Sequence, residues 1–253
     1  MTTGFLRFPR LGVLLGLLLG GVALLVPPQA VHAQFAPDRP GLGDGSSVVR
    51  AQTLQAELGY AFNDNSGFTA HEFGQLLLRY GVNDFLELRG GINSYVVTDA
   101  NDGYAGTSVG AKARLWRSEL AQLSGVATTG LPTGTGRFDT RDDRARQELK
   151  LVFDGALGAN LSLTVNGGLR FFYTDNAQTE WLFIPTLNSS LNERAGFYVG
   201  YAGFYAENAD ANWIEGGLTY LVHPNTQIDV NTGLQLDEAS DLFFLGLGLA
   251  HRF

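Results

Sequence analysis

Apolar and polar residues alternate along most of this chain with a period of two residues. The alternation is plain in the segment LFFLGLGLAHRF, which runs from Leu242 to Phe253. Because successive side chains of a strand point to opposite faces, large apolar residues fall on one face and Gly246, Gly248 and Ala250 fall on the other. The pattern predicts a terminal β-strand whose last residue is aromatic.

The same alternation predicts twelve strands separated by turn residues. Each is near or slightly above the length of a tilted strand that crosses a bilayer, about 9 to 11 residues, and an even number is typical of bacterial single-chain barrels. Short and generally longer connections alternate, which predicts an all-β, antiparallel up-and-down barrel with both termini in the periplasm. The predicted strands are residues 50–62, 67–81, 85–95, 104–116, 119–131, 147–157, 160–173, 179–191, 195–207, 213–222, 227–236 and 242–253.

The two faces of these predicted strands differ in polarity. One face carries no charge in any strand. A charge that faces lipid near the bilayer midplane costs about 2 to 4 kcal/mol, so we predict that this uncharged face contacts lipid. A soluble lipocalin-like barrel would turn the apolar face inward, but such barrels have about eight strands. The opposite, polar face then lines the lumen with Glu57, Arg79, Glu87, Arg89, Lys112, Arg114, Glu148, Lys150, Asp154, Arg170, Glu180, Glu215 and Asp229.

The predicted lumen is close to electrical neutrality, because seven acidic residues face seven basic ones when Arg252 is included. A strong anion or cation channel would carry an excess of one sign. The balance therefore favours uncharged or weakly polar solutes. The alternative is that these charges form cross-strand ion pairs that fill the barrel.

One stripe of the inward face is apolar instead of polar. It lies on the adjacent strands 179–191 and 195–207 and includes a residue of the last strand. We interpret it as a candidate track for a hydrophobic or aromatic solute, and the alternative is that an inward-folded loop or the N-terminal tail covers it. The stripe comprises Leu182, Ile184, Tyr198, Ala202, Phe204 and Phe244.

The N-terminus resembles a secretory signal peptide. Arg7 and Arg10 precede an apolar run over residues 11–26, which is shorter than the roughly 20 residues of a transmembrane helix. The small-residue site that ends at Ala33 predicts cleavage there, with cleavage after Ala30 as the alternative. We therefore expect a signal peptide over residues 1–33, a flexible periplasmic tail over 34–48 that is too short for a plug, and a barrel over 49–253.

Composition narrows the candidate chemistry. The chain has no cysteine and a net charge of −8, so it has no disulfide or thiolate chemistry and nucleic acid is not an expected partner. We predict no cofactor, no metal site and no enzymatic activity. A lipid hydrolase or acyltransferase would depend on His71 with Ser66 and Glu72, but the parity of His71 points it into the lumen. A register-shifting bulge would reverse that orientation.

Several segments resemble the outer-membrane family named for the meta-pathway of phenol degradation. They are LLLRYGVNDFLELRGG at 76–91, GAKARL at 110–115, LPTG at 131–134 and the block from 216 to the terminal HRF. The resemblance implies an outer-membrane barrel that moves small organic compounds.

We therefore expect a passive channel for small neutral, hydrophobic or aromatic compounds in the outer membrane of a Gram-negative-type bacterium. The main alternative is a closed structural or adhesive barrel. The expected partners are outer-membrane lipids, a small-molecule solute, and the barrel-assembly machinery, which would read the terminal strand with Phe253 as the assembly signal.

Overall fold

The computed structural model describes residues 35–65, 67–135, 144–173, 178–207, 210–237 and 241–253. The predicted signal peptide and Ser66 lie outside these residues. Over the described residues the chain forms one antiparallel sheet of 15 segments. The sheet closes on itself because β1 (Leu54–Asn65) pairs with β15 (Phe243–Arg252). Closure satisfies the backbone groups that a bilayer could not solvate.

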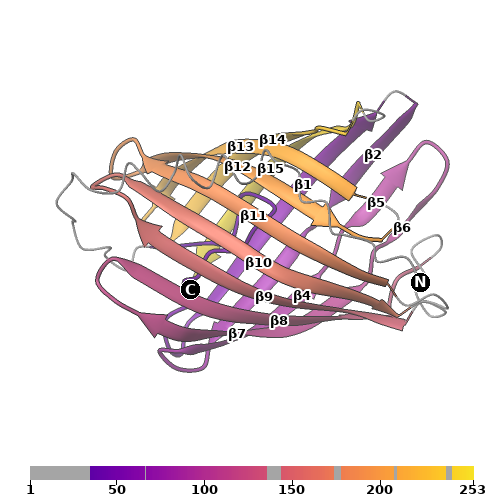
Figure 1. Ribbon diagram of the computed structural model, residues 1–253. Helices are drawn as coiled ribbons and strands as arrows, with labels where there is room; N and C mark the ends of the chain where they lie inside the picture. Colours follow the sequence, from indigo (N-terminus) through magenta and orange to yellow (C-terminus); the bar gives the residue numbers. More distant parts are fainter. Residues whose placement is uncertain (1–34, 66, 136–143, 174–177, 208–209, 238–240) are drawn as a thin grey trace, which may run out of the picture.

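The 15 segments make up twelve strands, because three strands are each interrupted once: β2 continues into β3, β4 into β5, and β6 into β7. The prediction of a twelve-stranded antiparallel barrel is confirmed (Figure 1). The remaining segments are β2 (Phe68–Phe73), β3 (Leu76–Gly81), β4 (Leu86–Ile92), β5 (Tyr95–Thr98), β6 (Asp102–Tyr104), β7 (Thr107–Arg117), β8 (Ala121–Leu131), β9 (Arg144–Ala156), β10 (Leu161–Tyr173), β11 (Gln178–Ser190), β12 (Ala195–Tyr205), β13 (Asp210–His223) and β14 (Thr226–Gln235).

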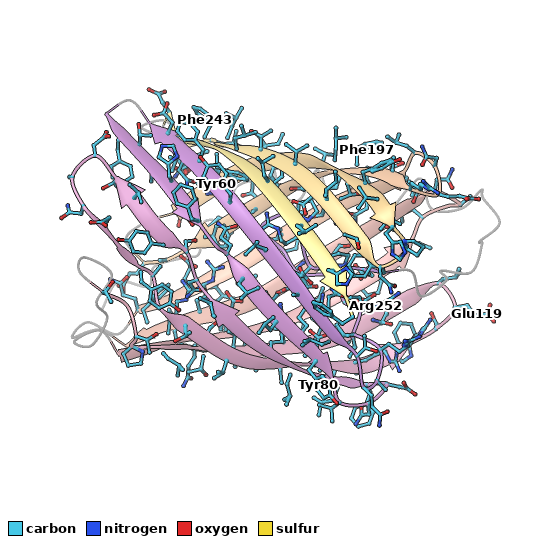
Figure 2. All side chains as sticks on the ribbon, turned by 180° about the vertical axis from the view of Figure 1, so that it is seen from behind. Tyr60, Tyr80, Glu119, Phe197, Phe243 and Arg252 are labelled. Atoms are coloured by element: carbon cyan, nitrogen blue, oxygen red, sulfur yellow. The ribbon has the colours of Figure 1, made fainter. Side chains whose placement is uncertain are left out.

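The outer wall is apolar and exposed, while charged side chains are buried inside. Leu88 and Leu247 each expose 52% of their surface on the outer face, whereas Arg79 and Lys112 expose none. Side chains project outward all around the barrel in Figure 2, including the labelled Phe197. This inverts the arrangement of a soluble protein and matches a wall that contacts lipid. No helix in the described ranges is long and apolar enough to cross a membrane.

The prediction that His71 points into the lumen is wrong, because a bulge lies between β2 and β3. Gly74 adopts a left-handed φ of 75°, and the extra residue reverses the side-chain parity on its N-terminal side. His71 therefore lies on the outer face, where its Nδ1 is 2.8 Å from the Tyr60 hydroxyl. Its neighbour Glu72 points inward and accepts hydrogen bonds from Gln75 and Ser94.

The segment before β1 lies inside the barrel. It starts beside Arg252 at the end of β15, where the guanidinium lies over the ring of Phe35, and returns to Gly81 at the end of β3. Between these points residues 35–53 contact inward side chains of strands around the wall; Figure 1 shows this indigo segment winding through the barrel. The prediction of a flexible periplasmic tail too short for a plug is contradicted by these contacts, because residues 35–53 lie in the lumen. These residues are called the tail from here on.

Candidate functional site: the occupied lumen

Three cations of the wall hold the carboxylate of Asp38 from the N-terminal segment. Lys112 Nζ lies 2.7 and 2.9 Å from its two oxygens, and Arg89 Nη2 lies 2.8 Å from Oδ2. Arg79 Nη1 is 3.5 Å from Oδ1. These side chains come from the neighbouring segments β3, β4 and β7. With Lys150 of β9, which pairs with the tail residue Asp44, they form the cationic cluster.

A second tail carboxylate, Asp44, occupies the same side of the lumen. Its Oδ1 accepts a hydrogen bond of 2.9 Å from Arg89, and its Oδ2 pairs with Lys150. Burial acts to raise the pKa of Asp44, but the charges of Arg89 and Lys150 outweigh it and hold the pKa well below its usual range. Asp44 is therefore ionised at neutral pH.

The wall supplies its own acids to this cationic cluster. Arg79 donates to Glu87 at 2.8 and 2.9 Å and to Glu57 at 2.8 Å. A further hydrogen bond of 2.8 Å joins Arg79 to the backbone carbonyl of tail residue Ser47. Cross-strand ion pairs thus join β1, β3 and β4 inside the lumen, as one of the two alternatives expected.

The opposite wall carries carboxylates that receive donors from the tail. Glu215 on β13 accepts the backbone N–H of Leu42, with both oxygens 3.1 Å from the nitrogen. Asp229 on β14 lies 3.5 Å from the guanidinium of Arg39. The cationic cluster and these two acids therefore lie on different strands, and among the described residues no cation of the wall pairs with Glu215 or Asp229.

Backbone and hydroxyl contacts fix the return of the tail. Asn166 accepts from the N–H of Asp44 and donates to its carbonyl oxygen, both at 2.9 Å. Ser46 donates to Asp154 through its N–H at 2.8 Å and its hydroxyl at 2.6 Å. The hydroxyl of Ser124 donates to the carbonyl of Ser46 at 2.6 Å. The wall thus holds the tail through neutral groups as well as charged ones.

The predicted apolar stripe is buried and partly covered by the tail. Leu182, Ile184, Ala202 and Phe204 form one apolar cluster, and Leu42 of the tail packs against it. Apolar area that is removed from water in this way stabilises the docked tail. The tail thus covers part of the stripe, which was the alternative to an open track for a hydrophobic solute.

The other two stripe residues lie next to this apolar cluster. The Tyr198 hydroxyl is 3.3 Å from Glu215, and the ring of Phe244 lies 5.8 Å from that of Trp213, which also packs on the cluster. Both Tyr198 and Phe244 are buried, so all the predicted stripe residues face inward.

The remaining predicted lumen residues lie away from the tail. Arg170 pairs with Glu148 at 2.5 Å and with Glu180 at 3.1 Å, and its guanidinium lies over the Phe204 ring at 4.6 Å. Arg114 makes no ion pair to any residue that the structure describes. The described residues include no group of three or more acids and histidines that could hold a metal ion.

Sequence reasoning did not find the tail residues that occupy the site. Asp38, Arg39, Leu42 and Asp44 lie in a Pro- and Gly-containing segment without periodicity, so no pattern marked them. The available signal was indirect, because an apolar stripe inside a polar lumen requires a cover.

A cavity of about 170 Å³ remains beside the tail. Its lining includes Asp44, Arg89, Glu148 and Lys150 together with the small residue Ser108. A cavity of roughly 150 Å³ is large enough to hold benzene. The occupied lumen thus retains space for one small organic molecule.

A family model described as "Putative MetA-pathway of phenol degradation" matches residues 37–253. The chain belongs to this family. Its barrel resembles the COG4313 outer membrane channel from Pseudomonas putida F1, with 15% identity, a TM-score of 0.66, and coverage of 85% of this chain and 99% of the other. Among curated proteins there is no match.

Two porins have a similar fold. The NanC porin is 8% identical with a TM-score of 0.58, and the match spans 78% of this chain and 98% of the porin chain. The KdgM porin, solved in complex with disordered oligogalacturonate, is 12% identical with a TM-score of 0.56, and the match spans 78% of this chain and 99% of the porin chain. The family member described here therefore shares the β-barrel fold of outer-membrane channels and porins.

Proposed function

We propose that this barrel is a passive outer-membrane channel for small organic compounds that are at least partly hydrophobic or aromatic. The observation that carries the proposal is a lumen lined by buried polar and charged side chains and occupied by a segment that is held without covalent bonds. Membership of the family and the fold shared with outer-membrane channels support it. Solutes larger than the remaining cavity would pass when the tail moves.

The occupied lumen also favours a second candidate, a closed structural or adhesive barrel in which the tail is permanent. The two candidates differ in whether the tail leaves its site. The chain has no cysteine, so a pair introduced as Ser46→Cys and Ser124→Cys would be unique. These positions are suitable because the Ser124 hydroxyl lies 2.6 Å from the carbonyl of Ser46.

Single-channel recording of this variant in a planar bilayer tests the proposal. We expect open levels for the wild type and for the reduced variant, and loss of the larger open levels after oxidation. Each single-cysteine variant should respond to neither treatment. If the wild type and the reduced variant are both silent, the closed barrel is correct and the proposed channel is wrong.

We infer that the barrel is not an enzyme, although His71 faces outward, where a lipid-cleaving residue would have to lie. The Tyr60 hydroxyl and His71 Nδ1 are hydrogen-bonded, but among the described residues no third group orients the imidazole as the base of a catalytic triad requires. An assay of phospholipid and lipid A turnover should give the same result for the wild type and His71→Ala. Turnover that depends on His71 would contradict this inference.

A further inference from the structure

We propose that the lumen contains a binding site for an amphipathic organic carboxylate, and that the tail occupies this site as a built-in substitute for the solute. The cationic cluster of Arg79, Arg89, Lys112 and Lys150 would take the carboxylate. The apolar cluster on β11 and β12 would take the hydrocarbon part. The inference rests on the proposed function only in requiring that a solute can enter the lumen.

Lys112 provides the first argument. Among the described residues, each hydrogen bond of its ammonium group is made to the tail: to both oxygens of Asp38, and to the carbonyls of Gly45 and Ser47. Lys112 is completely buried. When the tail leaves, the ammonium group loses all four of these hydrogen bonds, while Glu87, which faces Lys112 across the strands, stays bonded to Arg79. A second carboxylate is the group that restores its partners.

Arg89 provides the second argument. Its Nη2 already donates to Asp38 and Asp44, but its Nη1 is buried and has no hydrogen-bond partner among the residues that the structure describes. Arg89 also lines the cavity of about 170 Å³. A buried donor without a partner costs about 1 to 3 kcal/mol, so an acceptor in this cavity would be stabilised.

The distribution of charge favours an anion over the neutral solute that the overall balance predicted. In the cationic cluster four cations meet three wall carboxylates, Glu57, Glu87 and Glu148. The tail adds Asp38 and Asp44. Other acids of the wall, Glu72, Glu215 and Asp229, lie on other strands, β2, β13 and β14. A solute on the side of the cationic cluster therefore meets net positive charge once the tail has left.

The tail also shows what should accompany the carboxylate. Leu42 packs in the apolar cluster, while Asp44, two residues later, pairs with Arg89 and Lys150 across the lumen. Two residues span at most about 7 Å of backbone. A molecule with one ring or a short chain next to its carboxylate matches this spacing.

Calorimetric titration of the purified barrel in detergent tests the proposal with benzoate as the probe. Benzamide is the control of equal size without charge, and acetate is the control without the ring. The double variant Asp38→Asn, Asp44→Asn weakens the tail without altering the wall, and deletion of residues 36–47 is a second way to empty the site. Folding of each variant is checked by heat-modifiable migration.

In both tail variants we expect benzoate to bind on the order of tenfold more tightly than in the wild type, and tenfold more tightly than benzamide or acetate. Adding Lys112→Met should abolish this preference. Adding Arg114→Met, which removes a cation from the same face of β7 but outside the site, should leave it unchanged. Equal binding of benzoate and benzamide, or an unchanged preference after Lys112→Met, would overturn the proposal.

This experiment also separates the binding site from the proposed function, because binding in detergent does not require conduction. Benzoate binding by a barrel that is silent in bilayers would refute the channel and leave the site in place. An open channel without a preference for benzoate would refute the site and leave the channel in place.

Discussion

Replacement of Arg79 should have the largest effect on stability of any single change in the lumen. Its guanidinium is completely buried and donates to Glu57, Glu87 and the Ser47 carbonyl. Arg79→Met keeps most of the side-chain volume but leaves two buried carboxylates without their main cation. Removal of one partner from a buried ion pair costs about 3 to 5 kcal/mol.

Two other estimates are higher. Each hydrogen bond to a charged group contributes about 1.5 to 3 kcal/mol, and the three that Arg79 makes to carboxylates sum to roughly 4.5 to 9 kcal/mol. The loss per carboxylate has a ceiling, because protonating a group of ordinary pKa near 4 at pH 7 costs roughly 4 kcal/mol. Protonation of both carboxylates would therefore limit the loss to roughly 8 kcal/mol. The range for one lost partner is the lower estimate, and we expect Arg79→Met to lower the free energy of unfolding by about 3 to 5 kcal/mol.

Urea unfolding of the barrel reconstituted in lipid vesicles measures this change. The matched variant Arg79→Met, Glu57→Gln, Glu87→Gln should recover most of the loss, because it removes the unpaired carboxylates. A loss below about 1 kcal/mol, the usual range of an exposed ion pair, would refute the reasoning. So would a triple variant that is no more stable than Arg79→Met.

Three further predictions concern the tail, the apolar cluster and assembly. Gly81→Ala should release the end of the tail and increase conductance in bilayer recordings, because a Cβ at Gly81 would lie 2.1 Å from a tail backbone carbonyl oxygen. The control Gly90→Ala should leave the conductance unchanged, because a Cβ at Gly90 meets nothing within 4 Å. Equal conductance of the two variants would contradict this account. The double variant Leu182→Asp, Phe204→Asp places charge in the apolar cluster. It should reduce the flux of an aromatic solute in a liposome assay but leave the flux of glycerol unchanged. Equal effects on both solutes would exclude a role for this cluster. Phe253→Ala should lower the amount of folded barrel in the outer membrane, seen as less heat-modifiable protein in membrane fractions, if the terminal residue is the assembly signal; an unchanged amount would assign that signal elsewhere.

Strand number and order were predictable because lipid imposes a simple rule on the sequence. Each outward position must be uncharged, so the period of two is strong over the whole chain. The rule fails locally at Gly74, where one extra residue reverses the parity and moves His71 to the outer face. A single bulge leaves no periodic signal, so its position emerges only from the pairing of β1 with both β2 and β3.

The charged residues of the wall were predictable as lumen residues, but their partners were not. Parity placed Arg79, Arg89 and Lys112 on one face, and the structure gives each of them a partner in the tail. The tail has no secondary structure of its own, so its position depends on the chemistry of the wall rather than on any local preference. Counting the wall charges alone gave neutrality and concealed their separation.

The sequence by itself determined the closed barrel, its apolar exterior and its polar interior, because a bilayer forbids any other arrangement of strands with this alternation. Only the tertiary structure decided what the interior contains. Closure of the sheet brings Asp38 to Arg89, 51 residues later, and to Lys112, 74 residues later. It brings Asp44 to Arg89, 45 residues later. Contacts over such separations depend on the whole fold, and no segment of the chain encodes them alone.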